Sequence, residues 1–208
     1  MNNIVLKMNN KTSLFGKGRT KILECFYKFR NKEIYFSEIL RETGLTQNTT
    51  LKHLKVLEEA GLIISIKKIG NTFYRVLNSP QIYALFAYFD YQRLNALPSA
   101  RKRALLDFLD NLNIKPLIAL VFGSTAKGVF EKESDIDLLL VYNKKEKKDE
   151  KTEKEIKAIT GISVQSFIID YNYFKENLTS ESDKVVTHAI KTGFVASGFD
   201  LFYKEALK

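Results

Sequence analysis

A glycine and a serine between two apolar runs place the strongest constraint on the fold of this 208-residue chain. The run before Gly123 and Ser124 predicts a buried strand, and the run 135–142, which follows the serine after ten intervening residues, predicts a second strand. Asp135 and Asp137 are separated by one residue, so a strand directs both carboxylates to the same face. The segment therefore predicts two strands joined by a tight turn, with an acidic pair on the second strand.

Paired carboxylates beside a glycine turn suit phosphate-transfer chemistry. Two acidic groups on one face repel each other unless a cation lies between them, and Mg²⁺ commonly binds one or two carboxylates together with substrate phosphates. Gly123 permits a backbone to approach a phosphate closely, and Ser124 offers a main-chain N–H and a hydroxyl. Each piece alone also fits an ordinary turn or a solvated strand end. Their combination predicts a site for Mg²⁺ and a phosphate group.

The motif resembles that of the nucleotidyltransferase superfamily that includes DNA polymerase β, and more closely its minimal prokaryotic members. In these proteins a Gly-Ser pair is followed by a spacer of about ten residues and an Asp-x-Asp sequence. The resemblance covers roughly the last half of the chain and implies that residues 99–208 form an α/β domain with a small mixed sheet flanked by helices. The residues that carry the match are Gly123, Ser124, Ser134, Asp135 and Asp137.

The resemblance also implies a set of roles. Asp135 and Asp137 would be catalytic and would hold Mg²⁺, and a nucleoside triphosphate would be the substrate or ligand. Gly123, Ser124 and Lys127 would bind the nucleotide, with Lys127 standing where the family often carries an arginine. Minimal members of the family often work beside a helical partner protein of the HEPN type, so such a partner is a further expectation.

One position departs from the family pattern. The next strand usually supplies a third carboxylate, and its predicted counterpart, residues 162–169, carries Gln165 at the corresponding position. A shift of one residue brings Val164 or Ser166 there instead, and neither is acidic. An amide cannot serve as a general base. Asp170 follows the strand and either reaches into the site or caps the next helix.

Two functions remain open on this pattern. In the first, the protein transfers a nucleoside monophosphate to an acceptor, which the sequence does not identify among a protein hydroxyl, an RNA end and a small molecule. In the second, it is a transcriptional regulator that binds the nucleotide without turnover, as Gln165 favours. A purely structural adaptor leaves the acidic pair unexplained.

The amino-terminal half shows the periodicity of three helices followed by a hairpin. Helices are predicted over residues 14–29, 37–43 and 46–60, with Leu51, Leu54 and Leu57 of the third directed at the core. The hairpin is predicted over residues 62–76, where Gly70 can take the positive φ of a tight turn.

The stretch FSEILRETGLTQNTTLKHLKVLEEAGLI resembles the winged helix-turn-helix domains of ArsR- and MarR-type regulators. This implies a DNA-binding domain over residues 12–79 with double-stranded DNA as its partner. By the resemblance, the residues at the start of the third helix face base edges and the basic residues lie near phosphates. The base-facing residues are Gln47, Asn48, Thr49 and Thr50, and those near phosphates are Lys52, Lys55, Lys67, Lys68 and Arg75. Some winged helices contact only proteins, which is the alternative.

Charge supports DNA binding independently of the family. Residues 1–97 contain 15 Lys and Arg against 7 Asp and Glu, whereas residues 98–208 contain 18 against 17, within a net charge of +9. The excess positive charge therefore belongs to the half that carries the winged-helix pattern, where it can displace counterions from a duplex.

The remaining patterns set the organisation of the chain. An α+β protein is expected, with residues 80–98 as a helical linker whose tyrosines and phenylalanines serve either a homodimer contact or packing between the domains. The longest apolar runs are far shorter than the roughly 18 residues of a membrane span. Because the polar start also lacks a secretory segment, a cytoplasmic protein without membrane contact is expected.

Overall fold

The computed structural model describes residues 16–30, 32–68, 70–131 and 133–208. The chain has an α+β fold, as the sequence predicts, and divides into two compact units, Met1–Ser79 and Pro80–Lys208. The predicted start of the first domain at residue 12 lies outside the described residues. Within the described part, no helix is both long enough and apolar enough to span a membrane.

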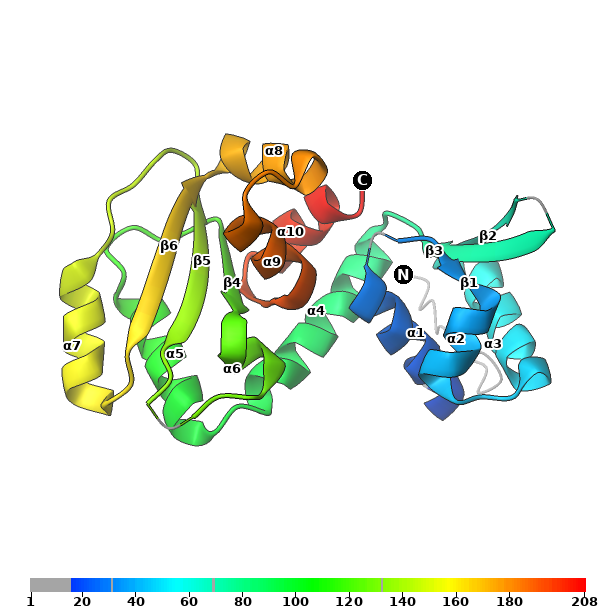
Figure 1. Cartoon of the computed structure of the whole chain (residues 1–208), viewed down its shortest axis with the longest axis horizontal. Helices are drawn as coiled ribbons and strands as arrows, with labels where there is room; N and C mark the ends of the chain where they lie inside the picture. Colours follow the sequence, from blue (N-terminus) through cyan, green and yellow to red (C-terminus); the bar gives the residue numbers. More distant parts are fainter. Residues whose placement is uncertain (1–15, 31, 69, 132) are drawn as a thin grey trace, which may run out of the picture. The chain divides into compact units, whose positions relative to one another are not determined.

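In its described residues, the amino-terminal unit has three helices and a three-stranded antiparallel sheet with the order β1-β3-β2 (Figure 1). The predicted order of helices and hairpin is thus present. Its elements are α1 (Lys17–Phe29), β1 (Ile34–Tyr35), α2 (Phe36–Thr43), α3 (Gln47–Glu59), β2 (Ile63–Lys68) and β3 (Asn71–Val76).

Local signals set the boundaries of the helices in this unit. Gly44 ends α2 in the left-handed region with φ of +63°, and the Thr46 hydroxyl begins α3 by accepting a hydrogen bond from the Thr49 N–H at 3.4 Å. Leu54 and Leu57 of α3 are buried, as predicted. Leu51 is 44% exposed, so the prediction that it points into the core is wrong.

The carboxy-terminal unit is built on a four-stranded mixed sheet with the order β6-β5-β4-β7. Strands β5 and β6 are parallel, and β4 is antiparallel to both β5 and β7. The strands are β4 (Ile118–Phe122), β5 (Ile136–Tyr142), β6 (Val164–Asp170) and β7 (Phe194–Ser197). The helices are α4 (Pro80–Asn95), α5 (Ser99–Asn111), α6 (Gly123–Lys127), α7 (Glu150–Thr160), α8 (Tyr171–Ser180), α9 (Lys184–Thr192) and α10 (Phe199–Ala206).

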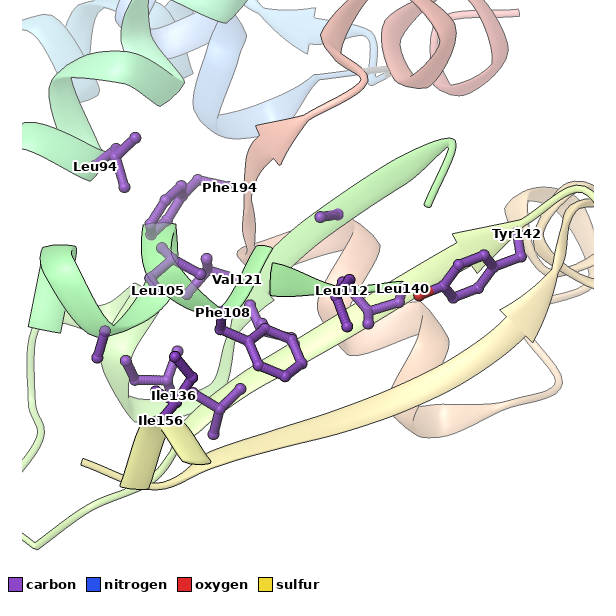
Figure 2. Close-up of a cluster of buried hydrophobic side chains, with 14 residues drawn as sticks. Leu94, Leu105, Phe108, Leu112, Val121, Ile136, Leu140, Tyr142, Ile156 and Phe194 are labelled. Atoms are coloured by element: carbon purple, nitrogen blue, oxygen red, sulfur yellow. The ribbon is translucent and has the colours of Figure 1, made fainter. Parts of the chain in front are cut away.

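Alternation along β5 separates an apolar face of the sheet from the face that carries the acids. Ile136 and Leu138 join a buried cluster with Leu105 and Phe108 of α5. Figure 2 shows Ile136, Leu105 and Phe108 in this cluster. Asp137 lies between the two apolar residues of β5 and therefore projects from the opposite face. The packing of Ile136 and Leu138 thus fixes the direction of the Asp137 side chain.

Strand β7 was not predicted from the sequence. It is four residues long and lies between Gly193 and Gly198, a length at which periodicity carries little information. Its Phe194 and Val195 are buried, and it pairs with β4. A β-carbon at Gly193 would lie 2.6 Å from the Val121 carbonyl oxygen, so the close approach of the backbones requires glycine there.

Helix α4 belongs to the carboxy-terminal unit, whereas the sequence assigns residues 80–98 to a linker between domains. Asp90 of α4 is fully buried, and its carboxylate accepts hydrogen bonds from the Val195 N–H at 3.1 Å and the Tyr203 hydroxyl at 2.5 Å. Arg93 donates to the carbonyls of Ala126 and Gly193 at 2.8 and 3.0 Å. These contacts make α4 part of the folded unit.

Candidate functional site

The glycine turn and the acidic strand meet at one point of the sheet. Phe122, the last residue of β4, pairs with Asp137 of β5, which brings the following Gly123 beside the same carboxylate. Gly123 has a φ of +66°, and a β-carbon at this position would lie 3.0 Å from the Asp137 Cγ and would overlap its Oδ2 atom. The predicted proximity of the turn and the acid is therefore present in the structure.

Asp135 and Asp137 act on each other electrostatically. Burial raises the pKa of Asp137, and the negative charge of Asp135 raises it further. Asp135 is exposed and precedes β5, while Asp137 is half-buried within the strand. The two negative charges repel each other, and a bound cation would remove this repulsion. Carboxylate oxygens are hard ligands of the kind that Mg²⁺ prefers, so the pair fits Mg²⁺.

The other predicted nucleotide ligands lie on the short helix α6. Ser124 is half-buried in its first turn, and its carbonyl accepts a hydrogen bond from the Val129 N–H at 3.2 Å. Lys127 is exposed at the end of α6, and Gly128 then ends the helix with φ of +71°. The structure thus leaves the ammonium group of Lys127 accessible to a ligand.

Arg101 of α5 holds the segment between the turn and the acidic strand. Its side chain is only 3% exposed and donates to the carbonyls of Glu131 at 3.0 Å and Asp135 at 3.5 Å, and also to the carbonyl of Ser134. It further donates to the Thr125 hydroxyl at 2.9 Å. Burial lowers the pKa of Arg101, and Asp135 opposes that change. Arg101 therefore positions the acidic strand relative to the glycine turn.

Thr125 and Ser134 complete this arrangement. The buried Thr125 hydroxyl donates to the Asp135 carbonyl at 3.3 Å, so that Arg101, Thr125 and Asp135 form one chain of hydrogen bonds. Ser134, a residue of the family motif, closes a turn by accepting from the Glu131 N–H at 2.9 Å through its hydroxyl. The serine of the motif therefore acts on the backbone that leads to Asp135.

Gln165 lies next to Asp137 across the parallel strands. The register of β5 and β6 pairs these two residues, so their side chains project from the same face about 4.8 Å apart along the sheet. Gln165 is exposed, whereas the neighbouring Val164 and Ser166 are buried on the other face. The register thus selects Gln165 among the three positions considered from the sequence. Among the described residues, no group of three or more His, Cys, Asp or Glu side chains could hold a metal ion.

Asp170 does not supply the missing carboxylate. It pairs with Tyr142 at the far end of β5, five residues from Asp137, which corresponds to roughly 16 Å along a strand. Its carboxylate instead caps α8 by accepting a hydrogen bond from the Tyr173 N–H at 3.0 Å. Of the two roles open from the sequence, the structure shows the helix cap.

Arg101 and Thr125 were not among the site residues predicted from the sequence. A signal for the arginine was present, because Arg101 precedes Ala104, Leu105 and Phe108 by three, four and seven residues, the spacing of one helix face. A charged residue on an otherwise apolar face must find partners when the face is buried. No comparable signal marked the threonine.

The third helix of the amino-terminal unit exposes a different set of residues from the one predicted. Gln47 and Asn48 are exposed and Thr49 is half-buried. Thr50 is fully buried and donates its hydroxyl to the Thr46 carbonyl at 2.9 Å, so the prediction that it faces base edges is wrong. The hydroxyl is satisfied within its own helix, which allows the residue to enter the core without an unpaired polar group.

The basic residues predicted near phosphates lie at the surface of this unit. Lys52, Lys55 and Lys67 are exposed and Arg75 is half-buried. The Lys68 ammonium is 2.5 Å from the Glu33 carboxylate and 5.4 Å from the centre of the Phe73 ring. Phosphate binding by Lys68 would therefore compete with an ion pair, as would binding by Lys55, whose ammonium is 3.9 Å from the Glu59 carboxylate.

Two family models match the chain. The model described as "Nucleotidyltransferase domain" matches residues 102–191, which include the glycine turn, the acidic pair and Gln165. The model described as "Bacterial regulatory protein, arsR family" matches residues 16–65, which include α1, α2 and α3. No curated protein and no solved structure gives a significant match to the chain.

Proposed function

The chain joins an arsR-family helix-turn-helix domain to a nucleotidyltransferase domain, and we propose that it binds duplex DNA and transfers a nucleotidyl group from a nucleoside triphosphate to an acceptor hydroxyl. The observation that carries the proposal is the contact between Gly123 and Asp137. This contact brings the backbone turn and the carboxylate pair into one small region, where both would meet phosphate oxygens.

The residues around this contact have separable roles. Asp135 and Asp137 would hold Mg²⁺, which supplies neutralisation of charge on the phosphate oxygens when it is bound. Gly123 leaves room for the Asp137 carboxylate beside the turn, Ser124 offers a hydroxyl, and Lys127 adds a positive charge. Arg101 holds the backbone of Asp135, so that the acids are preorganised before the ligand binds.

In the proposed reaction the oxygen of an acceptor hydroxyl attacks the α-phosphorus. A new phosphorus–oxygen bond forms, the bond from the α-phosphorus to the oxygen bridging it to the β-phosphate breaks, and pyrophosphate leaves. The acceptor loses its proton in this step. Gln165 cannot accept that proton, so the proton passes to solvent or to a phosphate oxygen, and the rate is expected to be low.

Labelled substrate tests the proposal directly. The full chain is incubated with each of the four ribonucleoside triphosphates labelled at the α-phosphate, with Mg²⁺ or with excess chelator, and both label transfer and pyrophosphate release are followed. We expect release that requires Mg²⁺ and is lost in Asp137→Asn. Transfer that persists unchanged in Asp137→Asn would show that the chemistry lies elsewhere.

A second function is favoured by the pairing of Gln165 with Asp137. In this alternative the protein is a transcriptional regulator whose nucleotidyltransferase domain binds a nucleoside triphosphate without turnover. The variant Gln165→Asp separates the two functions, with Gln165→Asn as the matched neutral control. If the wild type binds a nucleotide but releases no pyrophosphate, and Gln165→Asp alone gains release, the natural protein is the nucleotide-binding regulator.

DNA binding is tested through its dependence on salt. Exposed lysines that contact phosphates release counterions, so the affinity for a duplex should fall steeply between 50 and 200 mM salt, by roughly tenfold or more for each two or three contacts. Lys67→Glu combined with Lys68→Glu should weaken binding and lower the slope. Full affinity in that double variant would remove β2 from the interface.

A further inference from the structure

The exposed surface of α3 forms one continuous stripe that includes one apolar residue. With 100° per residue, the six exposed positions that define the stripe span about 140° of the helix circumference. Leu51 lies within the stripe, whereas Thr50, Leu54 and Leu57 are buried outside it. The stripe residues are Gln47, Asn48, Leu51, Lys52, Lys55 and Glu59, of which Glu59 lies at the end of the helix with its carboxylate 3.9 Å from the Lys55 ammonium.

The side chain of Leu51 is not buried in the core of its own unit. Leu51 is 44% exposed, and among the described residues of the amino-terminal unit only Tyr35 is another large apolar side chain of comparable exposure. Tyr35 is in ring contact with Phe73, with centroids 4.0 Å apart. A protein-binding surface would need a cluster of buried apolar anchors, whereas Leu51 is a single apolar group among amide and charged groups.

This combination of groups is complementary to the major groove at an A·T pair. Asn and Gln side chains pair with the N6 and N7 atoms of adenine, lysines meet phosphates or guanine, and an apolar side chain contacts the C5-methyl group of thymine. Gln47 and Asn48 occupy the first turn of α3, and Leu51 follows one turn later. The order along the helix places the amides and the apolar group over neighbouring base pairs.

We propose that Leu51 is a specificity-determining residue that reads the methyl group of a thymine in the major groove, beside bases read by Gln47 and Asn48. This inference rests on the proposed DNA binding. In this proposal Leu51, which was predicted to lie in the core, contacts a base. Thr50, which was predicted to face base edges, is buried and cannot do so.

The test uses the difference between thymine and uracil, which is one methyl group. The full chain selects duplexes from a pool with 20 random base pairs, and each dT of the enriched duplex is then replaced by dU in turn. At one thymine of the half-site we expect about a fourfold loss of affinity, as for one methyl group taken out of an apolar contact. At the other thymines the affinity should change less than twofold.

Protein variants assign that loss to the leucine. Leu51→Ala should weaken binding to the thymine duplex by at least as much and should bind the thymine and uracil duplexes equally. Lys52→Ala is the matched control, because it should weaken binding to both duplexes by the same factor. Since Leu51 is exposed, unchanged thermal unfolding of Leu51→Ala would show that the fold is retained.

The outcomes distinguish this inference from the function on which it rests. If no uracil substitution changes the affinity, or if Leu51→Ala keeps the full uracil penalty, Leu51 does not read a thymine although DNA binding stands. If no duplex is enriched at all, the proposed DNA binding fails and the inference fails with it.

Discussion

The carboxylate of Asp137 occupies the volume that a β-carbon on Gly123 would need. Gly123→Ala should therefore displace Asp137 and also force an L residue into the left-handed region. Gly128 provides a matched control, because its φ of +71° is similar and no atom lies within 4 Å of a β-carbon placed there. Gly128→Ala pays only the conformational strain.

We expect Gly128→Ala to lose roughly 1–2 kcal/mol of stability and to keep its affinity for nucleotide. Gly123→Ala should lose at least as much stability and at least tenfold in affinity for a Mg²⁺–nucleoside triphosphate, measured by calorimetry with each of the four nucleotides. Equal affinities in the two variants would separate the glycine turn from the ligand site.

The directions of the acidic side chains could be predicted from the sequence because side chains alternate strictly between the two faces of a strand. Ile136 and Leu138 must be buried, so Asp135 and Asp137 are forced to the other face. The family pattern pointed to Gln165 on the next strand, with Val164 and Ser166 left open, and the register of β5 and β6 selects Gln165.

Helix faces were less predictable. Adjacent helical positions are only 100° apart, so a small rotation of the predicted helix decides whether Thr50 or Leu51 faces the core. Apolarity favoured a buried leucine, but the Thr46 carbonyl satisfies the Thr50 hydroxyl, so the threonine can be buried without an unpaired polar group. Helix α4 posed a similar problem, because the exposed Tyr88 and Tyr91 lie on the face opposite its buried residues and obscure the apolar face in the sequence.

The raised pKa of Asp137 predicts that the site costs stability. A carboxyl group whose pKa is higher in the folded state than in the unfolded state loses stability as the pH rises from its ordinary pKa through the raised value. Asp137→Asn removes this loss and should raise the melting temperature at pH 7. Asp110→Asn, at an exposed position, is the control and should change it little.

Mg²⁺ provides the second arm of this measurement. Binding to the ionised pair should stabilise the wild type by an amount that grows with the logarithm of the metal concentration above Kd, and it should stabilise Asp137→Asn much less. A melting temperature of Asp137→Asn that equals or falls below the wild-type value at pH 7, in chelator, would contradict the destabilising role of this carboxylate.

Arg101 should affect both stability and ligand binding. Arg101→Met keeps much of the apolar volume but leaves the Thr125 hydroxyl and several carbonyls without their charged donor, which should cost about 3 kcal/mol in urea unfolding. Arg103→Met, at an exposed position on the same helix, should cost less than about 0.5 kcal/mol.

Arg101→Lys distinguishes positioning from bulk stability. One ammonium group cannot reach all the acceptors that the planar guanidinium spans, so the variant should fold yet leave the Asp135 backbone less restrained. We expect a reduced affinity for Mg²⁺ and nucleotide under conditions where unfolding shows the protein fully native. An unchanged affinity in folded Arg101→Lys would limit Arg101 to a structural role.

The membership of α4 in the carboxy-terminal unit gives a prediction about fragments. Residues 80–208 should unfold cooperatively as an isolated fragment, because they retain the hydrogen bonds of Asp90 and Arg93. Residues 99–208, the domain that the sequence analysis outlined, should fail to show a cooperative transition, because the Val195 N–H and the Tyr203 hydroxyl lose their buried acceptor. Circular dichroism with urea measures both.

Point variants in the full chain separate this contact from the general loss of a helix. Asp90→Ala removes the acceptor of two buried donors and should lower the free energy of unfolding by about 3 kcal/mol, whereas Tyr203→Phe removes one donor and should cost about half as much. The double variant should cost less than the sum of the two changes, since both remove the same hydrogen bond. If the losses in the free energy of unfolding were additive, or if the fragment 99–208 were as stable as 80–208, α4 would be a linker and not part of the folded unit.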